Sequence, residues 1–503
     1  MSYKITPTGE ATGAIYFDHL SPIKVFGTDK IRDTFGETTL QQAVNARFAP
    51  GVVDVVLTPD AHVGFGAPIG CIMASPTHIY PGPAGVDISC SMSLLQLDLP
   101  EDAIADKRLR RALINAICAR IPNGYGKGRA GKKPDFPVEN IEQAMTQGAT
   151  EATCQIFNVP VEWIQRCEEP THVGHCTNGE ILAERLEQIK FDITHGKGSF
   201  RHYAQKLAQI GSYGGGNHFG ECEIVRLSEY DKNIVKNESR LNVAKTFGLI
   251  DGNVAFLSHC GSRGLGNALA KRQFKLLQEK FKLWNIPLPG EDPELVYAPL
   301  DTPEANDYID DMALAANFAT MNHLIINALV LEAFQEVIPG ITGRLVYHIS
   351  HNIARREIVN DRPMWIHRKG ATRAYPAGHF ALAKTPFADT GHPILLPGNP
   401  TQGSSVMVGL EGASSSLYSV NHGAGRAMGR RVANQTLDQQ VVDQEFNDAD
   451  ILTNCRFYPK DEAPAAYKDF NEVLHSVEVA GLAREVARLQ ARFVIKDSSA
   501  PDD

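Results

Sequence analysis

The sequence has no long uninterrupted hydrophobic run and no excess of basic residues, and these two absences narrow the classes of function. No apolar stretch approaches the roughly 20 residues of a membrane-spanning helix. The first residues, MSYKITPTGEAT, lack the charged and then apolar pattern of a signal peptide. Lys and Arg total 49 against 58 Asp and Glu, which gives a formal net charge of −9. Proteins that coat nucleic acid are usually basic, so any nucleic-acid site here is expected to be a local basic patch.

Cysteine is also sparse, with nine residues scattered singly along 503. An odd number of isolated cysteines favours free thiols over a disulfide framework. Together with the missing signal peptide, this predicts a cytoplasmic protein without a membrane partner. The composition shows no break that would separate independent domains. We therefore predict one large catalytic domain over residues 1–496 and a disordered tail over 497–503.

The hydrophobic pattern predicts long helices mixed with short strands. Apolar side chains nearly all round residues 312–338 indicate a buried helix, while 265–284 and 471–492 read as amphipathic helices. Strands are expected within the β-branched or apolar runs 51–58, 247–258, 343–350, 403–410 and 492–496. This mixture indicates an α+β or a mixed α/β fold.

Several histidines stand beside glycine, asparagine or cysteine rather than inside apolar runs. His218 lies in GGGNHFGE, His259 in LSHCGSRG and His351 in HISHNIARRE, while GVDISC holds Asp87 and Cys90. Any one of these residues is more often structural than a ligand, and Asp87 and Cys90 can act together only across a turn or bulge. Three histidines at loop mouths, with a Cys–Asp pair, favour a metal site. A soft thiolate among imidazoles would ordinarily indicate zinc.

Two further segments carry features expected of a phosphate or RNA site. NHGAGR places His422 before a small-residue loop whose amides can approach a phosphate, with Arg426 nearby. Residues 344–373 hold seven Lys or Arg against two acidic residues. That stretch is interpreted either as a solvated face or as a groove for an RNA backbone.

In order, PDAHVGFGAPIG, PAGVDISC, GGGNHFGE, HCGSRGLGN, SHNIA, RKGATRA, SVNHGAGRAMGRR and APAAYKDFNEV resemble the motifs of the RtcB family of RNA ligases. The resemblance runs from about residue 55 to Lys496. It implies an α+β fold, a single large catalytic domain around a central dinuclear metal pocket. It also marks residues of about 123–210 as a longer insertion than in compact family members.

The resemblance implies an enzyme that joins RNA ending in a 2′,3′-cyclic phosphate or 3′-phosphate to RNA with a 5′-OH, using GTP and two Mn²⁺. His422 matches the histidine that is guanylylated, and a bridging cysteine is implied among the metal ligands, which are Asp87, Cys90, His218, His259 and His351. The positions implied to hold the guanine nucleotide are Asn217, His218, Phe219, Gly220, Glu221, His351, Asn352, Pro397, Gly398, Asn399, Pro400, Ser404, Gly423, Ala424, Gly425, Tyr467 and Lys496.

The sequence departs from the family pattern near two of these sites. PGNPTQGSS stands where the family usually has P-G-S-M-G, which puts Asn399 and Pro400 in place of a Ser–Met pair. DISCSM carries serines where glycines usually flank the cysteine. All proposed ligands and the nucleophile are kept, so catalysis is expected, while nucleotide preference and RNA substrate stay open.

Two other functions compete with RNA ligation. A metallophosphoesterase would use the same metal ligands with water as nucleophile, and it would need neither His422 nor GTP. A non-catalytic RNA-binding relative would have little reason to keep all five ligands together with His422. The natural RNA, the oligomeric state and the need for an activating accessory protein are left open by the sequence.

Overall fold

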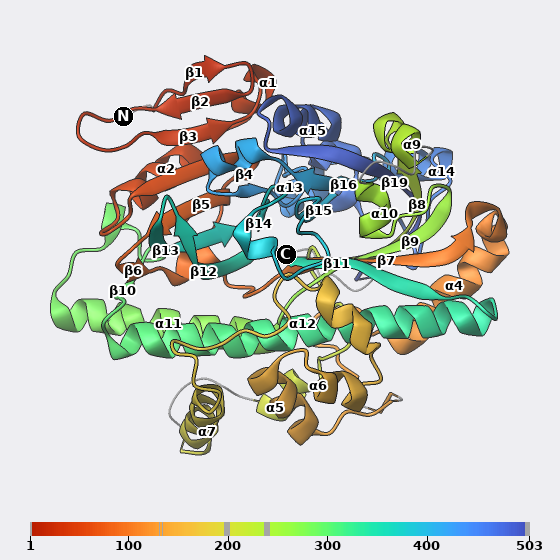
Figure 1. Cartoon of the computed structure of the whole chain (residues 1–503), viewed down its shortest axis with the longest axis horizontal. Helices are drawn as coiled ribbons and strands as arrows, with labels where there is room; N and C mark the ends of the chain where they lie inside the picture. The colour runs from red at the N-terminus through yellow and green to blue at the C-terminus, as the bar shows by residue number, and fades with distance from the viewer. Residues whose placement is uncertain (1–2, 130, 133, 196–201, 236–241, 498–503) are drawn as a thin grey trace.

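The computed structural model describes residues 3–129, 131–132, 134–195, 202–235 and 242–497, and within them two large sheets dominate (Figure 1). In order of neighbours, the seven-stranded sheet contains β1 (Thr6–Gly9), β2 (Thr12–Ile15), β3 (Ile23–Phe26), β4 (Asp54–His62), β5 (Ile69–Ser75), β13 (Arg362–Lys369) and β12 (Asn352–Val359). The eight-stranded sheet contains β11 (Gly343–Ser350), β7 (Ser91–Pro100), β9 (Asn253–Cys260), β8 (Phe219–Leu227), β19 (Ala483–Ile495), β16 (Ser404–Gly409) and β15 (Pro393–Pro397), with β18 (Leu452–Thr453) paired to β19.

Two short ladders complete the strands of the described residues. β6 (His78–Ile79) pairs with β10 (Ala298–Pro299), and β14 (Ala371–Arg373) pairs with β17 (Ser419–Asn421). Most neighbouring strands run antiparallel, except β3 with β4 and β18 with β19. Largely antiparallel sheets with helices set to one side make this an α+β fold, as predicted.

The helices of the described residues range from one turn to a rod of 35 residues. They are α1 (Asp29–Arg32), α2 (Glu37–Phe48), α3 (Pro81–Ala84), α4 (Lys107–Arg120), α5 (Val138–Gln147), α6 (Glu151–Ile156), α7 (Ile181–Thr194), α8 (Tyr203–Leu207), α9 (Glu229–Val235), α10 (Val243–Phe247), α11 (Arg263–Trp284), α12 (Pro303–Val337), α13 (Arg430–Thr436), α14 (Gln439–Asp448) and α15 (Phe470–Val479).

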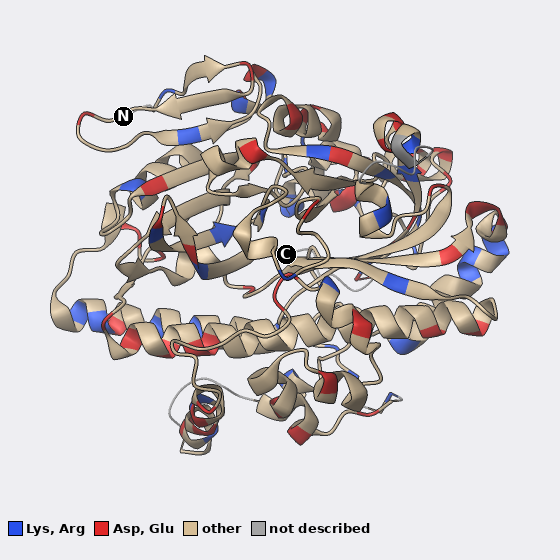
Figure 2. Ribbon diagram, in the orientation of Figure 1, with Lys and Arg blue, Asp and Glu red and all other residues tan. Residues whose placement is uncertain are grey.

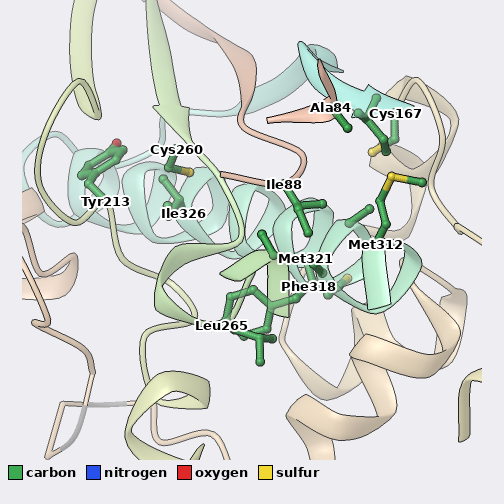
Figure 3. Close-up of a cluster of buried hydrophobic side chains, with 14 of the residues drawn as sticks. Ala84, Ile88, Cys167, Tyr213, Cys260, Leu265, Met312, Phe318, Met321 and Ile326 are labelled. Atoms are coloured by element: carbon green, nitrogen blue, oxygen red, sulfur yellow. The ribbon is translucent and has the colours of Figure 1, made fainter. Parts of the chain in front are cut away.

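The longest helix, α12, is the core of the molecule. Figure 1 shows it running beneath the sheets, with α5, α6 and α7 on its other side. It is long and apolar enough to cross a membrane, but 94% of its most apolar stretch is buried inside the fold. Figure 3 shows Met312, Phe318 and Met321 of α12 packed with Ile88, which comes from the Asp87–Cys90 turn. The core therefore fixes the loop that carries two proposed metal ligands.

The predicted helix over 312–338 is confirmed and begins nine residues earlier, where Thr302 caps it and Pro303 occupies its first turn. The predicted helix over 471–492 is wrong beyond Val479. Gly481 adopts a left-handed φ of 68°, which ends the helix, and residues 483–495 form β19. Side chains in ARLQARF alternate between apolar and polar with period two, which is the period of a strand.

The predicted insertion and tail stay predictions. Residues 138–194 of the expected insertion supply α5, α6 and α7. Of the tail expected over 497–503, Asp497 is buried, and 498–503 lie outside the described residues. All nine cysteines lie in the described part of the chain, and each is a free thiol.

Candidate active site

Five potential ligands converge where the ends of several strands meet the turn before β7. The Asp87 carboxylate lies 2.9 Å from Nε2 of His218, and Nε2 of His259 lies 3.3 Å from Nε2 of His351. The Cys90 sulfur lies between these two pairs, 3.5 Å from His218 Nε2 and 3.1 Å from His259 Nε2. Ligand atoms of Cys90, His218 and His259 fall within 4.8 Å of one another. The arrangement is compact enough for one thiolate to serve two ions.

A tight turn brings Asp87 and Cys90 together. Ser89 adopts a left-handed φ of 55°, and the amide of Cys90 donates to the carbonyl of Asp87 at 3.1 Å. On a regular strand these side chains would point to opposite faces. The turn instead brings the side chains of Asp87 and Cys90 to the same side, where both can contact one ligand.

Hydrogen bonds at the far ring nitrogens orient two of the histidines. Nδ1 of His218 donates to the carbonyl of Tyr213 at 2.9 Å, and Nδ1 of His259 donates to that of Asn217 at 3.0 Å. Nε2 of His259 then faces Cys90, and Nε2 of His218 faces both Cys90 and the Asp87 carboxylate. Burial also holds the pKa of His259 and of His351 well below the ordinary value, so both rings stay neutral. A neutral imidazole whose other ring nitrogen donates a hydrogen bond is a typical metal ligand.

His422 is held by one ring nitrogen with the other left available. Its Nδ1 lies 2.8 Å from both the Asp60 carboxylate and the carbonyl of Gly370. Asp60 is fully buried in β4 and accepts a 2.6 Å hydrogen bond from Thr58. Two acceptors at Nδ1 fix the proton there, so Nε2 keeps its lone pair. The ring centroid of His422 lies 4.6 Å from that of His351, which places this nitrogen beside the ligand cluster.

A cavity of about 300 Å³ opens over His422 and the ligand cluster. Its wall includes the loop after His422, and Gly425, with φ of 76°, packs so closely on Asp60 that a Cβ there would lie 2.6 Å from the Asp60 carbonyl oxygen. The cavity is lined by His62, Ile69, Met92, Asn217, Phe219, Glu221, His259, Pro397, Gly398, Pro400, His422, Gly423, Ala424, Gly425, Arg426, Arg430, Glu462, Tyr467 and Val494. Its volume and mixed polar and apolar lining suit a small organic ligand.

Buried charges gather on one wall of this cavity. Glu462 accepts 2.6 Å and 2.8 Å hydrogen bonds from Lys496 and Tyr467, and the Arg426 guanidinium lies 5.0 Å from the centre of the Tyr467 ring. Glu221 is buried, and its Oε1 has no hydrogen-bond partner. Burial, and then the neighbouring Glu223 and Glu462, raise the pKa of Glu221 well above its ordinary value. An unsatisfied carboxyl in a cavity wall is a group that a ligand can pair.

Comparison with known proteins identifies the family of the chain. The family model described as tRNA-splicing ligase RtcB matches residues 42–497. The chain is 32% identical over 494 residues to the tRNA-splicing ligase RtcB of Pyrobaculum aerophilum, with 94% of each chain covered. It is also 32% identical over 462 residues to the RNA-splicing ligase RtcB of Mycobacterium tuberculosis, with 89% of this chain and 98% of that protein covered. The chain belongs to the RtcB family.

Most positions that the RtcB motifs predict for the nucleotide line this cavity. The ones that line it are Asn217, Phe219, Glu221, Pro397, Gly398, Pro400, Gly423, Ala424, Gly425 and Tyr467. His218 and His351 lie in the ligand cluster beside it. Lys496 reaches the wall through Glu462, and its ammonium group lies 5.9 Å from the Phe219 ring centre.

Seven predicted nucleotide positions are absent from the cavity lining, and four of them lie neither in the ligand cluster nor beside Glu462. Asn352 accepts a 2.9 Å hydrogen bond from the amide of Gly370, so it supports the carbonyl that holds His422. Gly220 packs against Tyr213, and Ser404 is buried where β16 pairs with β19. Asn399 is also buried, and its side chain accepts from the amides of residues 401 and 402. Of the two departures in PGNPTQGSS, only Pro400 faces the cavity.

The prediction of a solvent-facing or RNA-binding basic stretch over 344–373 is wrong for three of its seven basic residues, while Arg356 is exposed. Arg355, Arg368 and Lys369 are buried. The two arginines are ion-paired with glutamates, and the Lys369 ammonium donates to the carbonyl of Gly82. Figure 2 shows acidic residues lying among the basic ones across the ribbon. These three cations are engaged by internal carboxylates and carbonyls, so they are not available to bind an RNA backbone.

Sequence reasoning missed Asp60, which the structure assigns as the partner of His422. The residue lies within the motif PDAHVGFG, but it is 362 positions from His422 and no local spacing links the two. His62, Arg430 and Glu462 of the cavity wall were also missed. The available signal was a carboxylate two residues beyond the predicted strand 51–58, in a segment that the structure includes in β4.

Replacing Asp60 with asparagine is expected to slow covalent labelling of His422 by GTP roughly a hundredfold or more. The asparagine amide can donate to Nδ1, which stabilises the tautomer that carries its proton on Nε2. Gly370 still accepts at Nδ1, so some activity should persist. Single-turnover labelling measures the rate, and equal metal uptake by both proteins serves as the control. A labelling rate equal to that of the wild type would contradict this role.

Proposed function

We propose that this chain is an RNA ligase that uses GTP to join RNA 3′-phosphate or 2′,3′-cyclic phosphate ends to 5′-hydroxyl ends. The observation that carries the proposal is the setting of His422. Its Nδ1 is bound by Asp60 and Gly370, and its Nε2 lies at a cavity beside the Cys90 cluster. A water-activating phosphoesterase has no use for a histidine prepared in this way.

The proposed reaction begins with nucleophilic attack by His422. The Nε2 lone pair forms a bond to the α-phosphorus of GTP, and the bond to the β-phosphate oxygen breaks, so pyrophosphate leaves. An RNA 3′-phosphate oxygen then attacks the same phosphorus, and the electrons of the N–P bond return to Nε2. A 5′-hydroxyl attacks the activated RNA phosphate in line and loses its proton, and GMP leaves. A cyclic phosphate must first be opened by water, because only an open phosphate can accept GMP.

Metal ions would be held by Asp87, Cys90, His218, His259 and His351, and two Mn²⁺ are proposed by family membership. Bound there, they would neutralise phosphate oxygens close to His422. The chain's own contribution is to keep the imidazoles of His259 and His351 neutral and to orient those of His218 and His259. It also holds the Nδ1 side of His422 against Asp60 and Gly370. The loop 423–425 lines the cavity directly after the nucleophile, where its backbone amides can meet phosphate oxygens.

Guanine recognition is proposed for Glu221. Guanine presents two adjacent donors, N1–H and N2–H, which a carboxylate can accept together, while adenine presents one acceptor at N1. Glu221 lines the cavity and has an unpaired buried oxygen. Guanine donors would stabilise its ionised form and so lower the raised pKa on binding.

Glu221→Gln is expected to lower the ratio of GTP to ATP labelling about tenfold or more. The amide replaces one acceptor with a donor that faces the guanine donors, and an unpaired buried group costs ~1–3 kcal/mol. Labelling with both nucleotides is compared side by side. Asn399→Ser is the control, since the Asn399 side chain bonds within its own turn and should leave the ratio unchanged. A normal ratio in Glu221→Gln would place guanine recognition elsewhere.

The proposed function is tested by incubating the protein with α-labelled GTP and Mn²⁺, followed by RNA with 3′-phosphate and 5′-hydroxyl ends. An acid-labile label on the protein, and its loss when ligated RNA forms, is the expected result. Release of phosphate from the RNA without GTP and without protein label would identify a phosphoesterase instead. RNA binding without either reaction would identify a non-catalytic relative.

A further inference from the structure

A buried ion cluster joins the segment after η2 (Val161–Arg166) to the strands beside the active site. β11 is an edge strand of the eight-stranded sheet, and the segment lies along that edge. Cys167 forms a parallel bridge with His348, and the amide of Glu168 donates to the His348 carbonyl at 2.9 Å. Cys167 is buried in the same core cluster as the side chains of α12 (Figure 3). The backbone on both sides of Glu168 is therefore fixed.

The Glu168 side chain is 2% exposed and lies among hydrogen-bond donors and guanidinium groups. Its Oε2 accepts hydrogen bonds from the amide and the hydroxyl of Ser350, at 3.1 Å and 2.8 Å. The same oxygen lies 2.7 Å from the Arg355 guanidinium, and Oε1 lies 3.1 Å from Arg373. Both carboxylate oxygens thus face donors only.

Glu169 closes the cluster with the same two arginines. Its carboxylate lies 2.8 Å from Arg355 and 2.8 Å from Arg373. Arg355, followed by Arg373, holds the pKa of Glu168 well below its ordinary value against the cost of burial. Arg373 also lies 3.3 Å from the Glu357 carboxylate. Loss of the Glu168 charge would therefore leave two buried guanidinium groups with fewer carboxylate partners.

Two connections link the cluster to the strand ends that carry His351 and His422. Ser350 directly precedes His351, and Arg355 also donates to the Ser350 hydroxyl at 3.1 Å. Arg373 ends β14, whose first residue, Ala371, donates its amide to the His351 carbonyl at 3.2 Å. β14 pairs with β17, which leads directly into His422. The cluster thus contacts the segment that carries His351 and, through β14, the strand β17 that precedes His422.

We infer that Glu168 is a positioning residue of the active site, which fixes His351 through Ser350 and Arg373. The inference rests on the proposed function, since it assigns His351 as a metal ligand. Glu168 contacts no cavity residue of the proposed nucleotide site, so its effect is transmitted through the backbone of residues 350–351 and through β14. The segment expected to be an insertion thereby contributes to the catalytic centre.

Glu168→Gln tests this role because it keeps the shape and removes one acceptor. An amide has a single oxygen, so its NH₂ group must face either the donors of Ser350 or the guanidinium of Arg373. We expect the variant to bind Co²⁺ about tenfold or more weakly, as is typical when a group supporting a ligand is lost. The titration is followed by the thiolate-to-cobalt charge-transfer absorbance of Cys90, which should also change shape.

Asp311→Asn is the matched control. Asp311 is a fully buried carboxylate on α12 that pairs with Arg185 at 2.8 Å, and it contacts none of the five ligands. It should lose a comparable amount of thermal stability with unchanged cobalt affinity and spectrum. Ser350→Ala removes only the hydroxyl hydrogen bond to Glu168 and should weaken cobalt binding several-fold in a folded protein. If Glu168→Gln does not fold, the cobalt affinity of Ser350→Ala tests the inference in its place.

Cobalt binding by Glu168→Gln equal to the wild type would overturn the inference, as would an equal loss in Asp311→Asn. For an unfolded Glu168→Gln, normal cobalt binding by Ser350→Ala would overturn it. The proposed function is judged separately on the wild type, by cobalt uptake and by labelling with GTP. A wild-type protein that takes up no cobalt would overturn the proposed function and this inference together.

Discussion

Replacing His422 with alanine is expected to abolish covalent labelling of the protein by GTP. The proposed covalent bond forms at Nε2, the only ring nitrogen that Asp60 and Gly370 leave free. Alanine supplies no atom to form that bond, so the loss should be complete rather than partial. Metal binding should remain nearly normal, because His422 contributes no atom to the group formed by Cys90, His218 and His259.

His62→Ala is a matched control for the loss of an imidazole from the same cavity. His62 lines the cavity, its Nδ1 lies 2.8 Å from the carbonyl of Asp60, and the proposed reaction gives it no bond to form. This variant should still be labelled. Label that accumulates on His422→Ala, at any position, would show that another residue is the nucleophile and would remove the central argument for ligation.

The ligand cluster shows how far a sequence can predict a site. The motifs around Cys90, His218, His259 and His351 lie far apart along the chain, and their order resembles one family, which the comparisons confirm. The motifs do not predict which residues of different motifs contact each other in the fold. The contact of Asp60 with His422 joins positions 362 residues apart, and only the folded ladder of β14 and β17 beside β4 creates it.

The clustering of basic residues along the sequence was a poor predictor of which basic side chains are exposed. Arg355 and Lys369 read as solvated or RNA-binding side chains because their sequence neighbours are polar or small. Their partners, Glu168 and the carbonyl of Gly82, come from segments more than 180 residues away. A charged side chain is buried only when such a partner exists, and the sequence does not show which partners meet.

Periodicity succeeded where one pattern dominated and failed where two patterns overlapped. The strand predicted over 343–350 matches β11, and α12 extends the predicted core helix toward its N-terminus. Residues 471–492 contain the end of helix α15 and most of strand β19. Both are amphipathic, and Gly481 lies between them. The left-handed φ of Gly481 marks the boundary, and a period of 3.6 fitted across it was wrong.

Cys90→Ser is expected to remove metal binding at both proposed ion positions together. The sulfur lies between the pair Asp87–His218 and the pair His259–His351, so one thiolate can complete both ligand sets. Burial and the Asp87 carboxylate raise the pKa of the Cys90 thiol well above its ordinary value in the metal-free protein. A divalent cation must therefore displace that proton, and a serine hydroxyl gives up its proton far less readily than a thiol.

The measurement is the number of ions retained per chain after dialysis against Mn²⁺, with wild type, Cys90→Ser and Cys71→Ser compared. Cys71 is also a buried thiol, in β5, and it belongs to no ligand set, so its serine variant should keep both ions. Cys90→Ser should keep neither at concentrations that saturate the wild type. Retention of one ion at normal affinity would show that each position has its own complete ligand set, and the bridging role of Cys90 would be wrong.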